Sequence, residues 1–221
     1  MLEEKEARAA VLAAAKGMLD HRLTSGTSGN VSARLDGEAV VITPSGVPYQ
    51  DMGPGDLVVI TLDGEPVSPG TGGLVPSSEH QLHTACYRAF PEIGAVLHSH
   101  PPYASMFAAA REPVPAVIDE AVIFLGGDIP IAPYAISGSA GVGTNAVWML
   151  AQRASALLAN HGLVSVAATP AQALHYAVVS EHCAQVAWGT RALGGHVPLP
   201  AATLETFGAA YRRGRGQPPS P

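Results

Sequence analysis

The segment from Gly94 to Pro102 constrains the fold of this chain more than any other. It reads Gly-Ala-Val-Leu-His-Ser-His-Pro-Pro, an apolar run that predicts a strand and two prolines that end it. Alternate side chains of a strand share one face, so His98 and His100 point to one side and Ser99 to the other. The pair fits surface histidines on a half-buried strand, but also two ligands of a divalent metal ion, with zinc the first candidate.

Length and composition are those of one folded domain. The chain has 221 residues, of which 47% are hydrophobic and 14% are charged. We expect one domain with its own core over residues 1–213 and a disordered, Pro-rich tail over residues 214–221. The net charge of −6 disfavours nucleic acid as a partner, because nucleic-acid binding normally needs a basic face.

The expected compartment follows from the cysteines and the apolar runs. Cys86 and Cys183 fall in helical patterns, which is typical of buried free thiols rather than of a disulfide framework. The acidic segment 1–6 predicts a helix and not a signal peptide. No apolar run approaches the ~18 residues of a membrane span. We therefore expect a cytoplasmic protein without a membrane partner.

Apolar periodicity predicts a single α/β domain, with helices flanking a sheet of short strands. Gly and Pro separate the segments, and Thr169-Pro170 is typical of a helix start. The predicted helices cover residues 3–21, 77–90, 103–110, 142–153, 170–193 and 202–213. The predicted strands cover residues 31–35, 39–43, 57–61, 94–100, 116–124, 129–132, 156–160 and 163–167.

A carboxylate and a third imidazole can complete a metal site. Ser77 or Ser78 is a good N-cap, and Glu79 then lies in the first turn, where a carboxylate is stabilising even without a catalytic role. His161 lies in a turn, and such a histidine alone is more often a turn residue than a ligand. His83 shares the face of Glu79 at i+4, where it lines the site or hydrogen-bonds to a ligand.

Three polar turns have the composition of an anion site. The segments 26–30, 43–46 and 77–78 offer hydroxyls and free backbone N–H groups. The helix that begins near residue 77 adds the positive end of its dipole. Each segment alone is typical of an ordinary turn, but together they can hold a phosphate without a Walker motif.

Short motifs follow one another along residues 5–190. They are Gly26-Thr27-Ser28-Gly29-Asn30-Val31-Ser32, Ile42-Thr43-Pro44-Ser45-Gly46, Pro76-Ser77-Ser78-Glu79, His98-Ser99-His100, Ala132-Pro133-Tyr134 and Leu158-Ala159-Asn160-His161-Gly162. Each motif is weak alone, but the ordered set is highly specific. In this order the motifs resemble the class II aldolase/adducin family, closest to its L-fuculose-1-phosphate aldolases.

The resemblance implies a fold and a set of roles. The fold is an αβα sandwich around a central, mostly antiparallel sheet, assembled as a homotetramer with active sites at subunit interfaces. The implied zinc ligands are His98, His100 and His161, with Glu79 as the fourth ligand in the resting state and the general acid/base in catalysis. The implied phosphate pocket consists of Thr27, Gly29, Asn30, Ser45, Gly46, Ser77 and Ser78.

The chain departs from the resemblance at one position. The fuculose enzymes place a tyrosine from a neighbouring subunit before a Gly-Gly that matches Gly126-Gly127, whereas this chain has Asp119-Glu120 there. The resemblance gives that tyrosine the role of the acid that protonates the leaving aldehyde. Glu120 or Asp119 can take over this role or simply shape the pocket. Tyr211 resembles the C-terminal tyrosine with which the family reaches a neighbouring site.

Several activities remain open within the resemblance. The leading one is a zinc-dependent aldolase that cleaves a phosphorylated sugar, L-fuculose 1-phosphate or a 5-deoxypentulose 1-phosphate, to dihydroxyacetone phosphate and a short aldehyde. A 4-epimerase, which tends to carry Asp where this chain has Glu79, and a dehydratase or decarboxylase are alternatives. A non-catalytic adducin-like module is a further alternative, but it should lack one or more ligands, and all are present here.

Overall fold

A computed structural model describes residues 3–36 and 38–214. Its centre is one eight-stranded sheet with the strand order β4-β3-β2-β1-β5-β8-β7-β6. Neighbouring strands are antiparallel except β6 and β7, which are parallel. The strands are β1 (Asn30–Arg34), β2 (Ala39–Ile42), β3 (Val58–Thr61), β4 (Pro66–Ser68), β5 (Ala95–Ser99), β6 (Ile131–Ala132), β7 (Ser155–Leu158) and β8 (Gly162–Ala167).

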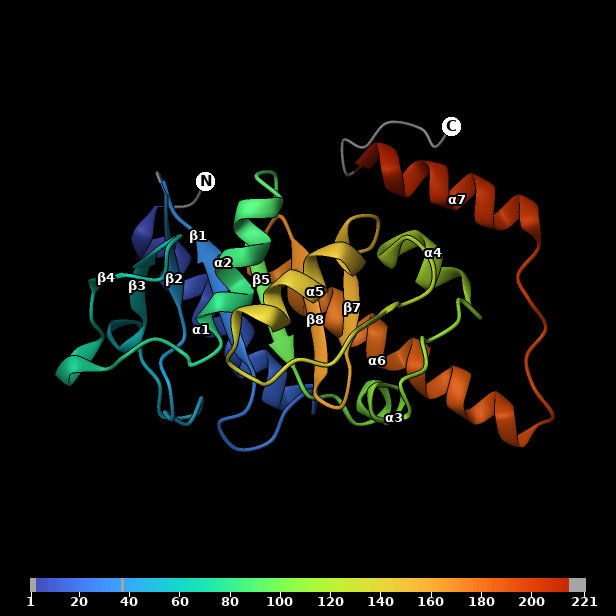
Figure 1. The fold of residues 1–221 in the computed structure, drawn as a ribbon, viewed down its shortest axis with the longest axis horizontal. Helices are drawn as coiled ribbons and strands as arrows, with labels where there is room; N and C mark the ends of the chain where they lie inside the picture. The colour runs from blue at the N-terminus through green and yellow to red at the C-terminus, as the bar shows by residue number, and fades with distance from the viewer. Residues whose placement is uncertain (1–2, 37, 215–221) are drawn as a thin grey trace.

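Helices cover both faces of the sheet, so the predicted αβα sandwich is confirmed (Figure 1). One core holds side chains of α1, α3, α4 and α6, and a second core on the other face holds those of α2 and α5. The helices are α1 (Glu4–Asp20), α2 (His80–Ala89), α3 (Pro102–Ala110), α4 (Asp119–Leu125), α5 (Ala140–Leu150), α6 (Pro170–Ala192) and α7 (Ala201–Gly214), with short 3-10 turns at Pro54–Asp56 and Thr71–Gly73.

The predicted strand over residues 116–124 is wrong, because this segment forms helix α4 (Asp119–Leu125). Its apolar run is short, and such runs do not distinguish a strand from a buried helix. Acidic Asp119 and Glu120 occupy the first turn, where they favour the helix dipole. Gly126 ends the helix in the left-handed region at φ 86°.

The C-terminal helix α7 packs beside α4, after a segment without regular structure that follows α6 (Figure 1). Of the predicted disordered tail, Gly214 ends α7 and residues 215–221 lie outside the described residues. Within the described part of the chain, none of the helices combines the length and apolar character that a membrane span requires.

Strand pairing brings the predicted site residues to one end of the sheet. β5 lies between β1 and β8, and Asn30 of β1 is directly opposite His98 of β5. On the other side of β5, Ser99 pairs with Leu163 of β8. The turn between β7 and β8, which carries His161, therefore lies next to the end of β5.

Candidate metal centre

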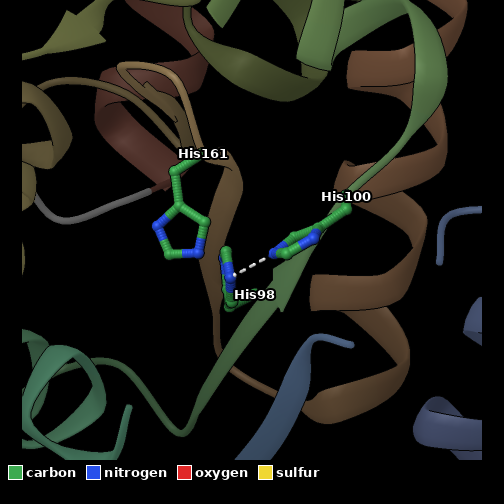
Figure 2. Close-up of side chains that lie close together, drawn as sticks. All are labelled: His98, His100 and His161. Carbon is green, nitrogen blue, oxygen red and sulfur yellow. Dashed lines mark hydrogen bonds between the residues drawn. The ribbon is translucent and has the colours of Figure 1, made fainter. Parts of the chain in front are cut away.

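Three histidines converge where β5 ends (Figure 2). His98 and His100 come from β5 and the residue that follows it, and His161 comes from the β7–β8 turn. Their potential ligand nitrogens all lie within 4.8 Å of one another, and the Nε2 atoms of His98 and His100 are 2.9 Å apart. The structure thus brings together the three imidazoles that the sequence predicted as ligands.

The β7–β8 turn holds His161 through two unusual backbone positions. Asn160 has φ 55°, a left-handed conformation that asparagine tolerates, and its N–H donates to the carbonyl of Ala108 at 2.9 Å. Gly162 follows, and a Cβ there would lie 2.5 Å from the carbonyl oxygen of Ser99. Only glycine therefore lets the turn approach β5 this closely.

The hydrogen bond of one ring and the pKa values of the other two fit a divalent cation. His98 donates its Nδ1–H to the carbonyl of Leu163 at 2.9 Å, which aims its Nε2 at the site. Burial and the charge of His98, then that of His161, lower the pKa of His100 to about 4, although Glu79 opposes this. Burial and His98 also lower the pKa of His161. Neutral imidazoles are the form that binds metal.

Glu79 faces this cluster from the start of α2. Its Oε2 lies 3.1 Å from Nε2 of His98, and its Oε1 lies 3.2 Å from Nε2 of His161. Asn30 donates to Oε2 at 3.0 Å, and Ser137 donates to Oε1 at 2.9 Å. Burial raises the pKa of the Glu79 carboxyl, but the histidines and Asn30 outweigh it and hold the pKa well below its usual value. Glu79 is therefore a carboxylate in this site.

A fourth histidine lies behind Glu79. The side chain of His83 is fully buried, and its Nε2 lies at hydrogen-bonding distance from Oδ1 of Asn30. Burial and the charge of His98 lower the pKa of His83 to about 3, so the ring is neutral near pH 7. The i+4 spacing from Glu79 thus predicted the shared face correctly, and the amide of Asn30 lies between His83 and Glu79.

The predicted phosphate segments lie close to Glu79. The chain at Pro44 pairs with Pro76 in an isolated bridge, and the N–H of Ser77 donates to the carbonyl of Thr43 at 3.1 Å. Ser77 is buried, and its Oγ accepts from the N–H of Glu79 at 3.2 Å. The backbone therefore ties two of the predicted phosphate segments together directly beside the carboxylate.

Exposure differs among the predicted phosphate residues. Gly29 and Gly46 adopt positive φ, at 80° and 74°. The amide of Asn30 contacts Glu79 and His83, so its side chain is already occupied within the protein. The exposed residues of the set are Thr27, Ser45, Gly46 and Ser78.

Tyr211 and Glu120 lie elsewhere in the chain. The ring of Tyr211 packs on Gly126, and it lines a cavity with Ile93 and Ala167, at the end of β5 and β8 opposite to His98. Glu120 is exposed at the start of α4, beside Asp119. Any role of these side chains at a metal centre would therefore be in a neighbouring subunit.

Sequence reasoning missed three polar partners of the site. Ser137 comes from the loop before α5, and no local pattern indicates that it reaches Glu79. Ser32 and Tyr87 extend the hydrogen bonds of His83 away from the site. Two signals could have found Ser32 and Tyr87. Ser32 is two residues from Asn30 on the same strand, and Tyr87 is four residues from His83 on the same helix.

Comparison with known proteins agrees with this geometry. Residues 9–188 match the family described as the class II aldolase and adducin N-terminal domain. A 5-deoxy-D-ribulose 1-phosphate aldolase of Bacillus thuringiensis serovar kurstaki is 35% identical over 98% of this chain and 100% of its own length. A 5-methylthioribulose-1-phosphate/5-deoxyribulose-1-phosphate aldolase of Rhodospirillum rubrum is 33% identical over 90% of this chain and 87% of its own.

The fold comparison points the same way. A solved structure of L-fuculose 1-phosphate aldolase superposes with a TM-score of 0.87 at 29% identity, over 94% of this chain and 96% of that one. The family and the enzyme class predicted from the motifs, a class II aldolase, are confirmed by these matches. The chain therefore belongs to the class II aldolase and adducin family.

Proposed function

We propose that this chain is a zinc-dependent aldolase that cleaves a ketose 1-phosphate reversibly to dihydroxyacetone phosphate and a short aldehyde. The names of its relatives make 5-deoxyribulose 1-phosphate the first substrate to test and L-fuculose 1-phosphate the second. One observation carries the proposal: the carboxylate of Glu79 faces the Nε2 atoms of His98 and His161, at 3.1 and 3.2 Å.

The donor set supports zinc. Three convergent imidazoles are a ligand set that zinc enzymes use, and the fixed Nδ1–H of His98 orients its Nε2 toward the site. We propose Glu79 as a fourth ligand in the resting state, displaced when substrate arrives. When bound, zinc supplies a Lewis acid that polarises the substrate carbonyl and stabilises developing negative charge.

The chain itself supplies a proton carrier. In cleavage, the C3–C4 bond breaks, its electron pair passes to C3 of the enediolate, and the C4 hydroxyl loses its proton as the aldehyde forms. C3 of the enediolate then gains a proton, which Glu79 delivers after its carboxylate has taken one up from water, and in the reverse direction the carboxylate removes that proton from C3 of dihydroxyacetone phosphate. The reverse step needs an ionised base. The carboxylate of Glu79 is ionised, and the hydrogen bonds that it accepts from Asn30 and Ser137 stabilise this form.

The phosphate would orient the reacting carbons. We propose that Thr27, Gly29, Asn30, Ser45, Gly46, Ser77 and Ser78 form its pocket. Support comes from the pairing of the two loops beside Glu79 and from the start of α2 at His80, whose N-terminal dipole favours an anion. Holding the substrate at both the phosphate and the metal restricts its motion, which is a source of rate enhancement.

We also propose that the protein works as a cytoplasmic homotetramer with its sites at subunit interfaces. Large apolar side chains on α5 and on the loop before it support an interface, since Trp148, Ile136 and Tyr134 are 76%, 72% and 56% exposed. In such an assembly Tyr211 or Glu120 of one subunit would take the proton of the C4 hydroxyl in the next.

A nuclear magnetic resonance time course on phosphosugars tests the proposal. The zinc-loaded protein is mixed with 5-deoxyribulose 1-phosphate, L-fuculose 1-phosphate and L-ribulose 5-phosphate in separate samples. We expect dihydroxyacetone phosphate and an aldehyde from one of the first two. Epimerisation, loss of water or loss of carbon dioxide without cleavage would overturn the proposal.

A further inference from the structure

A buried ladder of polar side chains joins β1 to α2 and ends on Glu79. Glu79, His83 and Tyr87 follow one another at i+4 spacing at the start of α2 and along it. Asn30 and Ser32 are two residues apart on β1, and both side chains point toward α2. Four helical residues rise about 6 Å, and two strand residues about 6.7 Å. The two repeats nearly coincide, so each turn of the helix meets the next inward side chain of the strand.

Each step of the ladder is a hydrogen bond between buried side chains. Asn30 contacts Oε2 of Glu79 at 3.0 Å and also Nε2 of His83. Nδ1 of His83 lies 2.6 Å from Oγ of Ser32, which lies 2.8 Å from the hydroxyl of Tyr87. No member is more than 8% exposed. Removing one of these side chains leaves a buried polar atom without a hydrogen-bond partner, and burial keeps water from replacing that partner.

The amide of Asn30 fixes the direction of every bond. Its Nδ2 donates to Oε2 of Glu79, and its Oδ1, which only accepts, faces Nε2 of His83. The neutral ring of His83 therefore carries its one proton on Nε2, and its Nδ1 accepts from the hydroxyl of Ser32. That hydroxyl in turn accepts from Tyr87. With these directions, each of the five side chains has a matched partner.

We propose that His83, Ser32 and Tyr87 are positioning residues that hold the amide of Asn30, and through it the carboxylate of Glu79, in the orientation for proton transfer. The role rests on the proposed function. It is not a proton path, because the amide of Asn30 interrupts it. At the other end, Arg34 donates to the carbonyl of Tyr87 at 2.6 Å and lies 4.9 Å above its ring, which fixes the last member.

The tautomer of His83 gives a test that needs no turnover. Long-range 1H–15N spectra of protein with 15N-labelled histidine distinguish the two nitrogens, and the signals that disappear in His83→Gln identify this ring. We expect a neutral ring protonated on Nε2. A proton on Nδ1, or a charged ring at pH 7, would reverse the bond directions and overturn the proposal.

Kinetics with a matched control test the effect on Glu79. Ser32→Ala removes the hydroxyl that contacts both His83 and Tyr87. Ser165→Ala removes an equally buried serine hydroxyl, paired with Ser155 at 2.8 Å in the same sheet, without contact to the ladder. We expect Ser32→Ala to lower kcat about tenfold with zinc content and KM nearly unchanged, because Ser32 itself belongs neither to the histidine cluster nor to the proposed phosphate pocket. Ser165→Ala should keep the wild-type kcat. Equal kcat values for the two variants would overturn the proposal.

Replacements of His83 add a rescue test. His83→Leu fills the space without a donor and should lower kcat about 10–100-fold. His83→Gln returns an N–H near the former Nε2 position and should recover most of this loss; no recovery would contradict the role. If His83→Leu does not fold, the Ser32→Ala comparison decides. If the wild type cleaves no phosphoketose, the proposed function fails, while the tautomer still decides the ladder.

Discussion

Asn30 and His98 face each other across the β1–β5 pair, and both meet the same oxygen of Glu79. Their Cα atoms are partners in the antiparallel register. Nδ2 of Asn30 lies 3.0 Å from Oε2 of Glu79, and Nε2 of His98 lies 3.1 Å from it. A slip of one residue would turn either side chain to the other face of the sheet. The register of this buried strand pair thus places the side chains of Asn30 and His98 at the same oxygen of Glu79.

Replacing Glu79 with glutamine should separate metal binding from proton transfer. Glu79→Gln keeps the size of the side chain and leaves all three histidines in place, so zinc should remain bound. It removes the base, and kcat should fall about 10²–10⁴-fold. Zinc content by plasma emission spectrometry and initial rates measure the two effects. Glu92→Gln, at an exposed carboxylate, is the control. Unchanged turnover in Glu79→Gln would remove this residue from the reaction.

Removing one imidazole should weaken the metal site directly. His100→Ala leaves two of the three convergent histidines. The zinc affinity should fall by more than the 10–100-fold that is lost when a side chain hydrogen-bonded to a metal ligand is removed. Competition with a chromophoric chelator measures the dissociation constant. His182→Ala removes an exposed histidine of α6 and should bind zinc like the wild type. Full affinity in His100→Ala would exclude it as a ligand.

The sequence predicted the local part of the site better than the long-range part. His98 and His100 share a strand face, and Glu79 and His83 share a helix face, so their spacing alone placed each pair. Ser137 could not be predicted, because its contact depends on where a loop far along the chain returns to Glu79. The residues alone offered His161 only as a candidate third imidazole, since a turn histidine has no periodic neighbour, and the family resemblance implied its role as a ligand.

The fold was predictable to a similar degree. Strong apolar strands such as β5 and β8 were found because their length and flanking residues agree with a buried strand. The segment at α4 was misread because its apolar run is as short as a strand. The edge strand β4, which holds only Pro66–Ser68 and is mostly exposed, has no apolar pattern to detect.

A methyl group on Gly29 should displace the backbone of His98. Gly29 has φ 80°, and a Cβ there would lie 2.7 Å from the carbonyl oxygen of His98. Gly26→Ala is a matched control, since Gly26 has φ 62° and open space around it. The left-handed backbone alone should cost about 1–2 kcal/mol in each variant. Gly29→Ala should lose at least about 1 kcal/mol more in urea unfolding, and should bind zinc more weakly, because its clash must displace β5. Equal losses would contradict this account.

The buried ring of His83 should make the metal-free protein sensitive to acid. Its pKa is about 3 in the folded chain, chiefly because of burial, against 6.5 in the unfolded chain. Below pH 6.5 the unfolded chain therefore binds a proton that the folded chain does not, and stability falls as the pH drops from 6.5 toward 3. From pH 7 to pH 5 this histidine should account for a loss of about 2 kcal/mol.

Urea unfolding of the metal-free protein at pH 7 and pH 5 measures this loss. His100 and Glu79 have lowered pKa values and add losses in the same direction, so the difference between variants isolates His83. His83→Gln should lose about 2 kcal/mol less than the wild type over this interval, because glutamine does not titrate. His182→Gln, at an exposed position, should lose as much as the wild type. Equal losses in all three proteins would mean that His83 is protonated in the folded state as readily as in the unfolded one.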